Sequence, residues 1–194
     1  DDITSNAYFG GQVNMKPGFL GREGNYRFYA IYDARNNYRD IDDSTKIKEN
    51  TAYGLSLDQE ISDGIGLFAR YAAQDDSVQF WSMEDDDKDG DGDIVDAEEI
   101  SNPVKSAISG GVSINGSRWG RGDDVLGIAA GVLSVNDKST AALDDNESHF
   151  EVYYKIGYSE HFTLTPDVQV VTNAGGDADN DTITVYGLRA QMNF

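Results

Sequence analysis

Apolar and polar residues alternate with a period of two through most of this chain, and no helical periodicity persists over three turns. Successive side chains of a strand point to opposite faces of a sheet, so the pattern predicts strands with one apolar and one polar face. The expected strands are 7–15, 25–33, 51–60, 64–73, 104–115, 124–135, 148–158, 162–172 and 182–194. The chain is therefore predicted to be all-β and antiparallel.

Charged residues inside these strands fall mainly on the polar face. The candidates to line a pore are Arg27, Arg70, Glu151, Lys155, Asp167 and Arg189. In a transmembrane barrel this face is the wetted lumen, because a Lys or Arg facing lipid at mid-bilayer costs roughly 2–4 kcal/mol. A soluble β-sandwich alternates in the same way but turns its apolar face inward. Alternation alone leaves both architectures open, and each of these residues can equally be a solvated side chain without selectivity.

The connections between the expected strands alternate in length. Segments 34–50, 74–103 and 136–147 are long, whereas 61–63 and 159–161 are tight turns. Long loops on one side and tight turns on the other are typical of outer-membrane barrels. Acidic residues gather in the long segments, and the formal charge of -20 argues against binding a nucleic-acid backbone.

Signatures of catalysis are scarce. The chain has two histidines, His149 and His161, and no cysteine. Neither a GxSxG nor an HExxH motif occurs, so nothing indicates a nucleophilic serine or a catalytic zinc. We expect residues 1–194 to form a single β domain that is not an enzyme.

The segment 84–100 is an acidic insertion in a long loop, and it contains DKDGDGDIVDAE in the register of a calcium loop. Alternate short carboxylates deliver the oxygens that Ca²⁺ needs to one point, and Gly92 permits the sharp turn. The predicted ligands are Asp87, Asp89, Asp91, the backbone carbonyl of Asp93, and Glu98. The alternative is a solvated acidic loop without a bound ion.

From about residue 24 onward the chain resembles the bacterial carbohydrate-selective porin family, especially its C-terminal half. The resemblance lies in GNYRFYAIY (24–32), YGLSLDQEISDGIGLFARY (53–71), RGDDVLG (121–127), EVYYKIGYS (151–159), LTPDVQ (164–169), TNAGG (172–176) and YGLRAQMNF (186–194). It implies a water-filled outer-membrane barrel that passes sugars and other small hydrophilic solutes, with the long acidic loops extracellular. The final Phe194 resembles the end of the terminal strand that the membrane-insertion machinery recognises.

The family's barrel needs about twice this length, so the resemblance implies about half of a barrel of roughly 16–18 strands. An unpaired strand edge is not tolerated in lipid, so a further chain or a missing N-terminal half is expected to complete the wall. With the last strand ending at the periplasm, strand parity places Asp1 in an extracellular loop. Two alternatives stay open: a small structural or adhesive barrel with calcium-stiffened loops, and a secreted calcium-binding β-sandwich.

The calcium loop makes a first prediction. An isolated loop should bind Ca²⁺ weakly, with a dissociation constant of about 10⁻⁴–10⁻³ M. Glu98→Gln should weaken binding further, because it removes the bidentate carboxylate, whereas Glu84→Gln outside the register should not. Isothermal titration with CaCl₂ measures both variants, and equal affinities would identify a solvated acidic loop.

Overall fold

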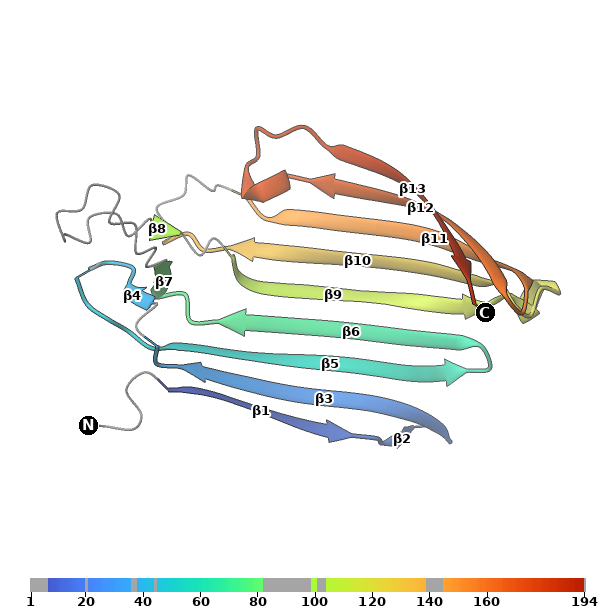
Figure 1. Ribbon diagram of the computed structural model, residues 1–194, viewed down its shortest axis with the longest axis horizontal. Helices are drawn as coiled ribbons and strands as arrows, with labels where there is room; N and C mark the ends of the chain where they lie inside the picture. Colours follow the sequence, from blue (N-terminus) through green and yellow to red (C-terminus); the bar gives the residue numbers. More distant parts are fainter. Residues whose placement is uncertain are drawn as a thin grey trace.

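The computed structural model describes residues 7–19, 21–35, 38–43, 45–81, 99–100, 104–138 and 145–193. Long antiparallel strands run in one sheet in the order β1-β3-β5-β6-β9-β10-β11-β12-β13, a meander in which each strand pairs with the next long strand of the chain (Figure 1). Their bounds are β1 Tyr8–Met15, β3 Arg22–Asp33, β5 Asn50–Ser62, β6 Ile65–Gln74, β9 Val104–Asn115, β10 Val125–Val135, β11 Glu147–Ser159, β12 Phe162–Thr172 and β13 Ile183–Met192. All the predicted strands are confirmed, because alternation over eight or more residues is a strong signal.

Four short strands were not predicted. β2 (Gly18–Phe19) extends the edge by pairing with β3. β4 (Tyr38–Asp40), β7 (Val78–Trp81) and β8 (Glu99–Ile100) form a separate small sheet at one end of the long strands (Figure 1). They lie in segments expected to be loops, and two to four residues are too few for a period of two to be recognised.

Among the described residues, none forms a second layer over either face of the long sheet. Within the described ranges, Ala34 and Val78 are the only buried hydrophobic residues. Large apolar side chains stand exposed along the sheet, among them Val13 at 60% and Leu188 at 70%. A soluble sandwich would bury this surface against another sheet, so the described part of the chain is not a sandwich.

The sheet is open. β1 and β13 are its two edges, and each pairs with one long strand, β3 and β12 respectively. Within the part of the chain that the structure describes, no helix is long and apolar enough to cross a membrane.

The connection between β9 and β10 is fastened to β11 by one carboxylate. Asp124 is 1% exposed and follows the short 3-10 helix Gly116–Trp119. It forms an ion pair with Arg121 and accepts hydrogen bonds from the Tyr154 hydroxyl at 2.6 Å and the Gly157 backbone N–H at 2.9 Å. The Arg121 guanidinium and the Tyr154 hydroxyl lower the pKa of Asp124 from 3.8 to about 2. This turn is therefore held in place by an ionised carboxylate.

Asp124→Asn should lower the unfolding midpoint of the detergent-solubilised protein at neutral pH. Because the folded-state pKa is depressed, the carboxylate's contribution is complete above pH 3.8 and is lost as pH falls through about 2. The variant should therefore lose less stability than the unmodified protein over that window. Circular dichroism during denaturant titration measures this. The exposed neighbour provides the control, and an equal effect of Asp123→Asn would contradict the role of Asp124.

Candidate functional site on the polar face

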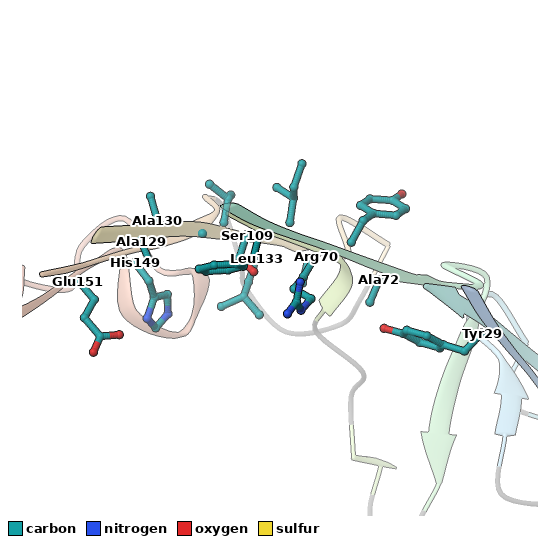
Figure 2. Close-up of a pocket in the computed structure, with 15 residues that line it drawn as sticks. Tyr29, Arg70, Ala72, Ser109, Ala129, Ala130, Leu133, His149 and Glu151 are labelled. Carbon is teal, nitrogen blue, oxygen red and sulfur yellow. The ribbon is translucent and has the colours of Figure 1, made fainter. Parts of the chain in front are cut away.

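The strand register gathers the predicted pore-lining residues on one face, called here the polar face. Residues opposite each other on antiparallel strands share a face, as do alternate residues along a strand. Arg27 and Arg70 both pair with Ser56. The register continues across β9 and β10 to His149, which shares its face with Glu151. Figure 2 shows Tyr29, Arg70, His149 and Glu151 on the same side of the sheet. The remaining three residues, Lys155, Asp167 and Arg189, join this face through the pairs Tyr153↔Asp167 and Thr165↔Arg189.

On β3, β5 and β6 the polar face carries a compact ionic cluster. Asp58 contacts Arg70 Nη2 through Oδ1 at 2.6 Å and Arg27 Nη1 through Oδ2 at 3.4 Å. Arg70 also donates to the Leu57 backbone carbonyl at 2.6 Å. Asp58 was not among the predicted residues. Its position two residues beyond Ser56 indicates that it lies on the polar face. Its contacts with Arg27 and Arg70 depend on how β3, β5 and β6 align, which the sequence does not indicate.

A second group of charges lies on β11, β12 and β13. Glu151, Lys155, Asp167 and Arg189 border a hollow of about 390 Å³. Hydroxyl and amide side chains complete its lining: Tyr153, Thr163, Thr165, Gln191 and Asn193. The structure therefore separates the predicted residues into two groups, with Arg27 and Arg70 in one and the other four in the second.

Aromatic rings of the polar face cover glycines on neighbouring strands. The pairs are Tyr29 over Gly54, Phe68 over Gly111 and Tyr153 over Gly127. A Cβ added to any of these glycines would collide with the partner ring. Each ring thus lies against the sheet, over the glycine of the adjacent strand. A ring in this position keeps one side of its π system available for stacking. Sequence reasoning missed these pairs, although the glycines stand at polar-face positions of the predicted strands.

Small residues form the floor of a hollow of about 420 Å³ between these groups (Figure 2). On the polar face the floor comprises Ala107, Ser109, Ala129 and Gly131, and the border includes Tyr29, Phe68, Arg70, His149 and Glu151. Four residues of the opposite face, Tyr71, Ile108, Ala130 and Val132, also line the hollow. Because the floor lacks bulk, the bordering side chains surround open space. The arrangement offers hydrogen-bonding and aromatic groups to a solute, and it contains no nucleophile–base pair that would indicate catalysis among the described residues.

The predicted calcium ligands, Asp87 to Glu98, lie outside the described residues, as does Phe194. Within the described ranges no group of three or more carboxylate or histidine side chains is placed to hold a metal ion. The calcium site therefore stays a prediction.

The family model described as "Carbohydrate-selective porin, OprB family" matches residues 6–194. Curated relatives include Porin AaxA of Chlamydia felis and of Chlamydia abortus, each 32% identical over 71 residues; these alignments cover 36% of this chain and 16% of each relative. A solved structure, "High pH structure of Pseudomonas putida OprB", is similar with a TM-score of 0.73 and 18% identity, covering 100% of this chain and 50% of that chain. At this identity the likeness shows a shared fold. The chain spans half the length of that solved structure.

Substituting a glycine that is covered by a ring should destabilise the protein more than substituting an uncovered glycine. Gly54→Ala and Gly127→Ala should each lower the free energy of unfolding by about 1–3 kcal/mol, because the new methyl group collides with the ring that covers the glycine. Gly11→Ala is the matched strand control, since nothing lies within 4 Å of the methyl it would add. Urea titrations of the three variants measure the effect. Equal losses at all three positions would contradict it.

Proposed function

The chain belongs to the OprB family of carbohydrate-selective porins, and from this premise we propose that it forms part of the wall of an outer-membrane channel. Through this channel sugars and other small hydrophilic solutes would diffuse passively. In this proposal the chain binds solutes weakly as they pass and catalyses no reaction. The long acidic loops would face the cell exterior and the tight turns the periplasm, as in outer-membrane barrels generally.

The observation that carries the proposal is the division of the sheet into two chemically opposite faces without a layer on either. Apolar residues pair across strands on one face, for example Val13 with Phe28 and Val152 with Val168. The polar face carries the ionic cluster and the hollow of about 390 Å³. A membrane barrel needs this division, because lipid solvates one face and water the other.

The polar face also offers what sugars bind. A sugar presents hydroxyl groups around its edge and C–H groups on its flat faces. Threonine hydroxyls, glutamine amides and charged side chains suit the edge, while the rings of Tyr29 and Tyr153 suit stacking against the flat faces. Weak sites of this kind favour passage, since a solute must be able to leave each one.

The open edges require partner strands. The polar backbone groups of β1 and β13 that face away from the sheet would stand unpaired in hydrocarbon, which is unfavourable by several kcal/mol for each group. We propose that a further chain, or an N-terminal half of the same protein, pairs with both edges and completes a barrel of about 16–18 strands. That the chain covers 50% of the solved porin chain supports this proposal. A structure in which β13 pairs directly with β1 would contradict it.

The two alternative functions, a secreted β-sandwich and a structural or adhesive barrel, require different structures. A secreted β-sandwich needs a second sheet against the apolar face, and the described residues provide none. A structural or adhesive barrel needs an interior filled by side chains. The small floor residues of the hollow of about 420 Å³ favour an open channel over a filled interior. The loop around Asp87 to Glu98 would bind Ca²⁺ in either barrel, so calcium does not distinguish these functions.

Cysteine substitution tests the facing of the strands, because the chain has no cysteine of its own. Glu151→Cys and Gln169→Cys lie opposite each other on the polar face, and Val152→Cys and Val168→Cys do so on the apolar face. In planar bilayers a charged thiol-specific reagent should modify the first pair and reduce conductance, and should leave the second pair unmodified. Equal reaction at all four positions, or no conductance from the unmodified complete barrel, would refute the channel.

A further inference from the structure

Two cations and a hydroxyl stand in one row across the last three strands. The register that pairs Tyr153 with Asp167 and Ile156 with Leu164 sets Lys155 opposite Thr165, and Thr165 pairs with Arg189. Neighbouring strands are about 4.8 Å apart, so the Lys155 and Arg189 backbones are about 10 Å apart, with Thr165 between them. All three side chains border the same hollow. Their flexible stems allow both cationic ends to meet above Thr165.

These cations have no carboxylate partner in the part of the chain that the structure describes. Lys155 Nζ and the Arg189 guanidinium form neither an ion pair within 4.0 Å nor a side-chain hydrogen bond with any described residue. Arg27 and Arg70 differ, since Asp58 contacts both. On the polar face, Arg27 and Arg70 therefore share one carboxylate, whereas Lys155 and Arg189 form no ion pair among the described residues.

The two carboxylates that border this hollow, Glu151 and Asp167, form no ion pair with Lys155 or Arg189 among the described residues. Asp167 lies over Gly187 on the neighbouring strand and accepts a hydrogen bond from Gln169 at 3.3 Å. Glu151 is four residues from Lys155 along β11, which is about 13 Å of extended strand. Neither carboxylate accepts a hydrogen bond from Lys155, Thr165 or Arg189, so the donors of these three side chains are available to a solute.

We propose that Lys155, Thr165 and Arg189 form a weak binding step for the anionic group of an acidic sugar, either a carboxylate or a phosphate. This inference rests on the proposed channel and adds a class of solute to it. The ammonium and guanidinium groups contact the anion from two sides, and the Thr165 hydroxyl donates a third hydrogen bond. Because the site faces water, binding is weak enough to release the solute onward.

Uptake of labelled solutes into liposomes containing the native protein tests this step. Glucuronate and glucose have the same ring and differ at the sixth carbon, so the ratio of their initial rates isolates the anionic group. Lys155→Met/Arg189→Met should lower that ratio about fivefold, which corresponds to losing a charge contact in a water-exposed site. Lys155→Arg/Arg189→Lys keeps both charges and should hold the ratio within about twofold.

A salt series makes the test independent of whether the variants fold. In the unmodified protein, raising NaCl from about 0.1 M to about 1 M shortens the screening length from about 10 Å to about 3 Å and should lower the same ratio. Glucose 6-phosphate replaces glucuronate in a second arm. Dependence on the two cations in either arm supports the proposal and identifies the preferred anion.

The outcomes separate this inference from the channel itself. If glucose uptake does not exceed that of protein-free liposomes, the proposed channel fails. If glucose enters but neither acidic sugar shows a ratio that depends on salt or on the two cations, the channel stands and the anion step is refuted. A double methionine variant that slows glucose and glucuronate equally also refutes the step, since it indicates a general change in the pore.

Discussion

Backbone hydrogen bonding in hydrocarbon is the constraint on which the rest of this structure depends. Lipid offers no partner to an N–H or C=O group, so every strand that crosses it must be paired along its length. The ladder from β1 to β13 meets that requirement for all strands except the two at the edges. Once the ladder is fixed, the alternation of side chains follows, because each residue is assigned to lipid or water by its position in the register. The polar face is therefore a consequence of pairing.

The long strands could be predicted from the sequence because apolar and polar residues alternate, so the polarity of each residue indicates the face of the sheet on which it lies. Strand β9 (Val104–Asn115) and strand β12 (Phe162–Thr172) have the bounds that alternation indicated. The candidate residues were placed on one face by the same reasoning. Which of them meet was not predictable from alternation, since it depends on how strands distant in sequence align. Asp58 illustrates this: it joins Arg27 to Arg70 across three strands, and no local pattern near residue 58 indicates those partners.

Charge is distributed unevenly in two directions. Along the strands, described acidic residues lie at the end that carries the small sheet, among them Asp40 of β4 and Asp75 and Asp76 between β6 and β7 (Figure 1). Across the sheet, Arg27 of β3 and Arg70 of β6 both contact Asp58, whereas Lys155 and Arg189 form no ion pair among the described residues. A net charge of -20 therefore says little about the local potential on the polar face, because charges of both signs are unevenly distributed over the chain.

Rings over glycines follow from the absence of an opposing layer. In a β-sandwich an inward-facing tyrosine is covered by the second sheet, and the free energy of burial is about 25 cal/mol per Å² of apolar surface. A water-filled channel has no second sheet, so a ring gains contact only by lying on its own wall. That requires a neighbour without a side chain, which Gly54 provides for Tyr29 and Gly127 for Tyr153. In the proposed channel the same arrangement would keep the rings away from the centre, so the contacts that stabilise the sheet would also leave room for solutes.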